Sequence, residues 1–101
     1  MNFEYALNDN SLNVKLTGRV DVISAPVLHE KVNFLLSSNE NLNKLIFDFS
    51  EVSYISSMGL RILLDFQKTM AQRGSMKVIN VSSDVFEIFK ATGFDNILSF
   101  S

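Results

Sequence analysis

Two adjacent serines, Ser56 and Ser57, come directly before a run of apolar residues at helical spacing. The first turn of a helix carries backbone N–H groups without intrahelical partners and the positive end of the helix dipole. These donors point at a phosphate placed there, so phosphate chemistry is the first candidate. Gly59 would let a partner or a phosphate approach the backbone closely, because glycine has no Cβ. A second interpretation stays open: serine is a common N-cap, and one of the two would then only start the helix.

A second polar segment, residues 18–25, is expected to lie beside the segment 50–59 that contains the serines. It contains Asp21 and Ser24, and Ser24 before Ala25-Pro26 is typical of an N-cap followed by a first helical turn. In open α/β sheets the loops beyond the carboxyl ends of the strands form the binding site. We therefore expect function at this edge, on the surface rather than in a deep pocket, since 101 residues bury a modest share of their surface.

The composition offers little support for other chemistry. The one histidine, His29, is expected to be solvated on the polar side of a helix, which argues against a Ser-His-Asp arrangement. Cysteine is absent and no phosphate-binding glycine loop occurs, so we expect neither a metal site nor a nucleotide cofactor. The sequence predicts a protein that is not an enzyme and needs no cofactor.

Charge and hydropathy narrow the range of partners. The net charge is −2 and the nine Lys and Arg residues are scattered, so nucleic acid is not an expected partner. Apolar runs are only a few residues long, and residues 1–6 carry no basic segment, so neither membrane insertion nor a signal peptide is predicted. These features and the absence of cysteine favour a cytoplasmic location.

Apolar periodicity predicts one α/β domain over residues 1–101. Alternation over 3–7 and 12–16 indicates a hairpin with one wet face, ending at Thr17-Gly18. The run 45–49 is nearly all apolar, as in a strand covered on both faces. The next elements expected in chain order are a helix over 24–36, a connector over 50–54 and a helix that starts at Ser56-Ser57 and ends near Arg73. A strand over 76–81, a helix over 85–92 and a strand or packed tail over 97–100 follow.

Together these elements form a mixed sheet of four or five strands with three main helices packed on it. The unit 45–81 is strand, helix, strand, and is expected to be parallel with a right-handed crossover. Asp48 is expected at the exit of its strand, bonded to loop backbone, and Arg73 near the helix end complements the dipole. Gly74 and Gly93 are expected to terminate helices, and Ser82, Ser83 or Asp84 to begin the last one.

Three stretches carry a family resemblance. They are residues 48–64, DFSEVSYISSMGLRILL; residues 16–21, LTGRVD; and residues 85–97, VFEIFKATGFDNI. In this order they resemble the STAS domain family, specifically the bacterial anti-sigma factor antagonists, over essentially the whole chain. The resemblance implies a binding protein that takes part in partner switching and regulates transcription.

The resemblance also implies roles for residues and partners. Ser57 corresponds to the family's phosphate acceptor, with Ser56 as the alternative. The implied partners are an anti-sigma factor that is also a serine kinase, which binds the unmodified form, and a serine phosphatase that acts on the phosphorylated form. The implied partner-binding residues are Asp21, Ser24, Ser56, Met58, Gly59, Leu60 and Arg61.

Two departures and one alternative accompany this interpretation. Ser56 stands where many members have Asp, which removes a charge beside the acceptor, and Met58 replaces a usually smaller residue. The alternative function is that of a STAS accessory subunit of a membrane transporter for lipids or anions, docked on an ATPase subunit.

Overall fold

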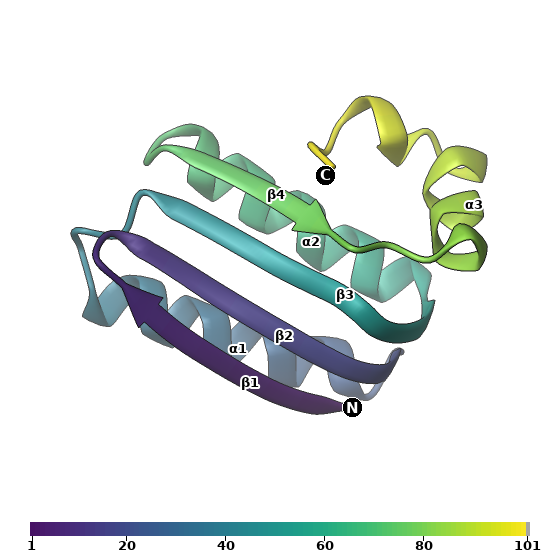
Figure 1. Ribbon diagram of the computed structural model, residues 1–101, viewed down its shortest axis with the longest axis horizontal. Helices are drawn as coiled ribbons and strands as arrows, with labels where there is room; N and C mark the ends of the chain where they lie inside the picture. Colours follow the sequence, from purple (N-terminus) through teal and green to yellow (C-terminus); the bar gives the residue numbers. More distant parts are fainter. Residues whose placement is uncertain (101) are drawn as a thin grey trace.

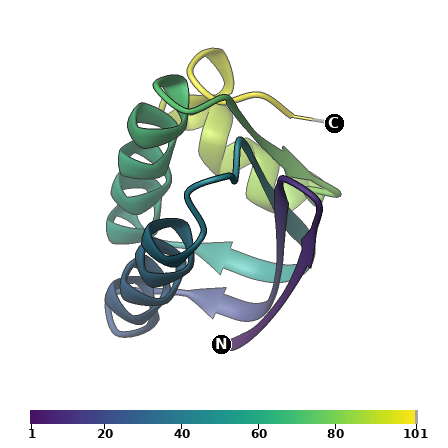
Figure 2. The same cartoon turned by 90° about the vertical axis from the view of Figure 1, so that its left-hand side faces the viewer.

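The computed structural model describes residues 1–100 and contains a four-stranded mixed sheet in the order β1-β2-β3-β4. Figure 1 shows the sheet in front of the two longest helices, and Figure 2 shows that these helices cover one face of it. The predicted α/β fold is therefore confirmed, with four strands and three main helices. The elements run β1 Asn2–Asn8, β2 Ser11–Val20, α1 Ser24–Ser38, β3 Lys44–Ile55, α2 Ser57–Ala71, β4 Ser75–Ile79, α3 Ser83–Ala91 and the short 3₁₀ helix η1 Phe94–Asn96.

The first two strands form the predicted hairpin. They pair antiparallel from Asn2 with Thr17 to Asn8 with Ser11, and Asp9 turns the chain with φ of 54°. The expectation of one wet face is wrong for β1, because all of its residues except the half-buried Phe3 are exposed. β1 is an edge strand, so the helices cover only part of the side on which its apolar residues lie.

Two strands are longer than the sequence pattern indicated. β2 does not end at Thr17-Gly18 but continues to Val20, because Gly18 adopts φ of 97° within an irregularity of the β2–β3 pairing. The segment 50–54 is not a connector: it continues β3 and pairs with the second half of β2. Both strands therefore deliver their carboxyl ends further along the chain than predicted.

The sheet is covered on one face only. Leu45, Phe47 and Phe49 of β3 are fully buried on the helical side, whereas Ile46 and Asp48 between them are half-buried on the open face. The prediction that this strand is covered on both faces is therefore wrong. The crossover connections β2–α1–β3 and β3–α2–β4 place both long helices on the same side of the sheet.

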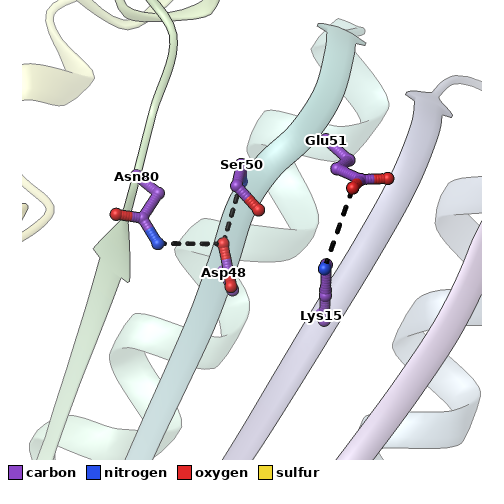
Figure 3. A network of polar contacts seen from close by, with 5 residues as sticks. All are labelled: Lys15, Asp48, Ser50, Glu51 and Asn80. Atoms are coloured by element: carbon purple, nitrogen blue, oxygen red, sulfur yellow. Dashed lines mark hydrogen bonds and ion pairs between the residues drawn. The ribbon is translucent and has the colours of Figure 1, made fainter.

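Asp48 lies in the middle of β3 rather than at its exit. Its Oδ1 accepts hydrogen bonds from the Ser50 backbone N–H at 2.9 Å and the Asn80 side-chain amide at 3.2 Å (Figure 3). Partial burial alone would raise the pKa of Asp48, but these donors outweigh it and hold the pKa below its ordinary value.

An exposed ion pair lies beside Asp48 on the open face of the sheet. Lys15 Nζ is 3.8 Å from Glu51 Oε1 (Figure 3), and an exposed pair of this kind contributes little to the stability of the fold.

Aromatic side chains fill the core between sheet and helices. Phe47 stacks on Phe66 of α2 with ring centroids 5.7 Å apart, and Phe49 meets Phe89 of α3 at 6.2 Å. The predicted apolar face of α1 is confirmed, with its members fully or almost fully buried: Leu28, Val32, Leu35 and Leu36. Helix α2 is thereby fixed against β3, and α1 packs on β2 and on α2, which sets where the first turns of both helices lie.

The end of α2 is anchored by an arginine. Arg73 does not simply complement a dipole: its guanidinium donates to the backbone carbonyls of Leu36, Asn39 and Leu42 at 3.0–3.2 Å. These carbonyls belong to the last turn of α1 and the following loop, so one side chain ties the two helices together. Gly74 leaves room for the backbone of Asn43, where a Cβ would collide.

The C-terminal segment is a packed tail rather than a regular strand. Ser82 is the N-cap of α3 and accepts from the Val85 N–H at 3.3 Å, while Gly93 ends the helix region with φ of 79°. Leu98 is buried, and Phe100 forms an isolated bridge with Val78 of β4. Within residues 1–100, no helix is both long and apolar enough to cross a membrane.

Candidate functional site

The two polar segments expected to bind lie together at the end of the sheet where the parallel strands β2 and β3 have their carboxyl ends. β2 and β3 are parallel, and their last pair is Val20 with Ile55. The Ser56 N–H donates to the Val20 carbonyl at 2.8 Å, so the chain leaves both strands side by side. Because the strands are longer than expected, the connections shrink to residues 21–23 after β2 and Ser56 after β3.

The two serines have different positions. Ser56 is the N-cap of α2: its backbone is extended and its Oγ accepts from the Gly59 N–H at 3.2 Å. The interpretation that one serine serves as a cap is therefore confirmed for Ser56. Ser57 is the first residue of the helix and is exposed, so its hydroxyl is accessible from outside while its backbone N–H lies at the positive helix end.

Two predicted contact residues face inward instead. A Cβ on Gly59 would lie 2.7 Å from Ile55 Cγ1 and 3.0 Å from Val20 Cγ1, so the helix needs glycine to pack on its own sheet. Glycine at position 59 thus serves packing within the chain, and its contact with a partner stays a prediction. Leu60 is only 5% exposed and belongs to the core. The cause is the one-residue connection from Ile55, which holds the first turn of α2 tightly over the strand ends.

Asp21 and Ser24 form a closed hydrogen-bonded turn. Asp21 Oδ1 accepts from the backbone N–H groups of Ile23 at 3.1 Å and Ser24 at 2.9 Å. The Ser24 hydroxyl accepts from the Asp21 N–H at 2.9 Å and lies 3.0 Å from the Arg19 carbonyl. Ser24 is thus not an N-cap, because α1 begins at Ser24 and the N-cap position is Ile23, whose side chain makes no cap bond. Both polar side chains shape the loop.

The turn exposes apolar residues that the sequence analysis missed. Val22 is 62% exposed and Ile23 is 81% exposed, at the same sheet edge as Ser57. Met58, which the resemblance did implicate, is 38% exposed, and Arg61 is exposed one helical turn after Ser57. The signal for Val22 and Ile23 was present: two bulky apolar residues in a short loop fit neither the strand pattern before them nor the helix pattern after them.

The histidine is not part of this site. His29 was expected to be solvated, but its ring is half-buried between α1 and α2, 5.4 Å from the Phe66 ring and 3.8 Å from Asp65 Oδ2. Asp65 lies about two turns along α2 from Ser57, so no Ser-His pair forms. Within the described part of the chain, residues 1–100, no group of His, Cys, Asp and Glu could hold a metal ion.

The Asp21 turn predicts a specific pH dependence. The Ser24 backbone N–H is the main cause that holds the pKa of Asp21 below its ordinary value of 3.8. The resulting stabilisation is present above pH 3.8 and is lost as the pH falls through the lower, folded-state pKa. NMR titration of the carboxyl carbon should give a midpoint below 3.8. Ser24→Ala removes only the hydroxyl that also donates to Asp21 Oδ1, so it should move the midpoint part of the way upward while the backbone donors remain. A wild-type midpoint at or above 3.8 would contradict the turn.

Comparison with known proteins identifies the family. Residues 2–101 match the STAS domain model. The chain belongs to the STAS domain family. It is 34% identical to the anti-sigma-B factor antagonist of Bacillus subtilis, covering 100% of this chain and 91% of that protein. The STAS fold thus accounts for the parallel strand ends and the helix that starts at Ser57.

Two solved structures share the fold. The unphosphorylated anti-sigma factor antagonist SpoIIAA superposes with a TM-score of 0.84 at 18% identity, covering 99% of this chain and 88% of that one. The phosphorylated form of SpoIIAA, a Bacillus cell fate determinant, superposes with a TM-score of 0.75 at 17% identity, covering 99% and 91%. At such identities the likeness concerns the STAS architecture alone.

Proposed function

We propose that this STAS domain is an anti-sigma factor antagonist that is switched off by phosphorylation of Ser57. The observation that carries the proposal is the accessible Ser57 on the first turn of α2, at a sheet edge that also exposes Val22, Ile23 and Met58. The full-length similarity to the Bacillus subtilis antagonist supports the same function. The protein then acts by binding and release, without chemistry of its own.

The unmodified surface has the composition of a binding site. A partner that covers exposed apolar side chains stabilises the complex by roughly 25 cal/mol per Å² of apolar surface removed from water. Val22, Ile23 and Met58 supply this apolar part, and Arg61 supplies a charge at its rim. The proposed partner is an anti-sigma factor that is also a serine kinase, and its capture frees the sigma factor.

Phosphorylation changes the charge at the centre of this surface. The Ser57 Oγ attacks the γ-phosphorus of ATP held by the kinase, the bond to ADP breaks, and the hydroxyl proton passes to the kinase. The product carries close to two negative charges beside the apolar side chains. The fold tolerates them, because Ser57 is exposed and the helix dipole favours an anion there. The complex with the kinase does not tolerate these charges, because the phosphate must lose its hydration when the partner covers it. A serine phosphatase would restore the active form.

Ser57 is a better acceptor than Ser56 on geometry. The Ser56 Oγ already accepts from the Gly59 N–H and caps α2, and its side chain is half-buried. Transfer of phosphate to Ser56 would require that the cap open, which costs about 1 kcal/mol. Ser57 has no such cost, since it lies in the exposed first turn.

The test is phosphate transfer from the anti-sigma factor kinases of the same genome. The protein is incubated with each kinase and ATP, and any phosphate is mapped by mass spectrometry. We expect phosphate on Ser57, none in Ser57→Ala, and normal incorporation in the matched variant Ser56→Gly, since glycine also serves as an N-cap. Phosphate on Ser56 would move the switch to the neighbouring residue. Absence of phosphate from every kinase, with a folded protein, would favour an accessory subunit of a lipid or anion transporter.

A further inference from the structure

The two edges of the sheet differ in how they are protected. β4 is flanked by the C-terminal tail, where the Val78 N–H donates to the Ser99 carbonyl at 2.9 Å and Phe100 bridges Val78. β1 pairs with β2 along seven residues, and within residues 1–100 no strand pairs with its outer edge. Its outward N–H and C=O groups are therefore free for another strand, whereas those near Val78 are in use.

β1 also lacks the features that prevent edge pairing. Proteins blunt such edges with proline, lysine, bulges or very short strands. β1 has seven residues, NFEYALN, with Glu4 as its only charge, and its pairing with β2 is continuous from Asn2 to Asn8. The irregularities of this sheet lie between β2 and β3 instead. The edge is thus free of bulges, nearly uncharged and open.

The helical side of this edge carries an apolar surface. Phe3, Tyr5 and Leu7 share one face of β1, since they pair with the buried Leu16, Val14 and Leu12 of β2. Tyr5 remains 52% exposed and Phe34 of α1 is 69% exposed, and both line one groove between β1 and α1. We call the apolar part of this surface the β1–α1 surface; it consists of Phe3, Tyr5, Val27 and Phe34 of the groove and the exposed Leu7 next along β1. Glu30 and Lys31 of α1 also line the groove, and Lys31 Nζ lies 5.4 Å from the centre of the Phe3 ring.

We propose that a second copy of the chain occupies this edge, with β1 pairing antiparallel to β1 of the other copy about a twofold axis. A second copy brings what the edge lacks: a strand of the same length and the same apolar surface on the same side. The result is one continuous sheet of eight strands, twice the four of a single chain. This inference goes beyond the proposed antagonist function and does not depend on it.

Side-chain alternation restricts the register. Directly opposed residues lie on the same face, so the twofold axis must pass through a residue and not between two. An axis at Glu4 is unfavourable, because it places two carboxylates opposite each other. An axis at Ala6 is also unfavourable, because Phe3 would then have no opposing residue of β1. An axis at Tyr5 pairs all seven residues, with Glu4 opposite Ala6 and Phe3 opposite Leu7 of the other copy. The two Tyr5 rings then face each other, a favourable aromatic cross-strand pair.

The area fits a weak dimer. The exposed parts of the β1–α1 surface amount to roughly 300 Å² per copy, given the size of aromatic side chains and of typical surface patches. Two such surfaces contribute about 600 Å², and burial of the two strand edges brings the total toward the lower limit for a specific interface, about 1,000 Å². The dimer should therefore form at micromolar concentrations or above. Ser57 lies beyond the carboxyl ends of β2 and β3, not on the β1 edge, so both copies keep that site free.

Sedimentation over a concentration series tests the dimer. We expect the mass to rise from monomer to dimer in the micromolar range, and Tyr5→Lys to raise the dissociation constant by about tenfold or more, because it opposes two charges at the axis. Ile97→Lys, which places the same charge at an exposed apolar residue outside the β1–α1 surface, should have no such effect. A wild-type monomer up to about 1 mM, or a dimer that Tyr5→Lys leaves intact, would overturn the proposal.

Cysteine cross-linking tests the register, since the chain has no cysteine of its own. Under mild oxidation, Tyr5→Cys should form a covalent dimer, because residue 5 opposes itself and cross-strand Cβ atoms lie close enough for a disulfide. Phe3→Cys and Leu7→Cys should cross-link when mixed and much less when oxidised separately. Equal cross-linking of Tyr5→Cys and the distant Ile97→Cys would overturn the proposed register.

Discussion

Phosphorylation of Ser57 is expected to weaken binding of the anti-sigma factor kinase by a hundredfold or more, which corresponds to about 3 kcal/mol. The phosphate brings close to two charges into a surface that otherwise buries Val22, Ile23 and Met58. Ser57→Asp carries one charge on a shorter side chain, so we expect a loss on the order of tenfold, near 1.4 kcal/mol. Ser57→Ala adds no charge and should bind like the wild type. Calorimetry with the purified kinase measures all three affinities.

The chain offers a matched control for the charge itself. Ser83 follows the N-cap Ser82 of α3 as Ser57 follows the N-cap Ser56 of α2, and both are exposed first residues of a helix. Ser83→Asp therefore places the same charge at the same position of a helix dipole, outside the proposed contact surface. It should leave the affinity unchanged, and neither Asp variant should lower the melting temperature. Equal weakening by both variants would show that net charge, and not the Ser57 surface, governs binding.

Much of the fold was predictable because the apolar pattern was regular. Alternation located the hairpin, and helical spacing located α1 and the buried face of α2. The lengths of β2 and β3 were not predictable from the same signals. Gly18 indicates the end of a strand, yet its φ of 97° lets the pairing shift without ending it. Ser50, Glu51 and Ser53 suggest a loop only because they are polar, and all three lie exposed in a strand.

The site was predictable in place but only partly in detail. Family resemblance and the carboxyl-end rule both indicated the edge where Ser57 lies. Neither could tell which small residues face outward, since that depends on the packing of α2 over the strand ends. Gly59 was interpreted as a contact residue because glycine often permits close approach. The groups that approach the Gly59 backbone closely are the side chains of Ile55 and Val20 of the same chain.

Replacing Gly59 by Val should therefore destabilise the fold by about 3 kcal/mol, as is common when a well-packed core is overfilled. The new Cβ would lie 2.7 Å from Ile55 Cγ1 and 3.2 Å from the Val20 carbonyl oxygen, closer than either can accommodate without movement. Gly59→Ala should lose less, because alanine recovers up to about 1 kcal/mol of helix propensity. Denaturant unfolding measures both changes. Met58→Val, at the exposed neighbouring position, should stay within about 1 kcal/mol of the wild type.

A double-mutant cycle locates the collision. Ile55→Ala leaves a cavity in the wild type, but in Gly59→Ala it also makes space for the added methyl group. The two changes together should therefore be less destabilising than their sum, by about 1 kcal/mol for residues in direct contact. Additive effects would mean that the Cβ is accommodated elsewhere, and an unchanged Gly59→Val protein with weaker kinase binding would return Gly59 to the contact surface. The cycle separates packing from partner contact because stability is measured without the kinase.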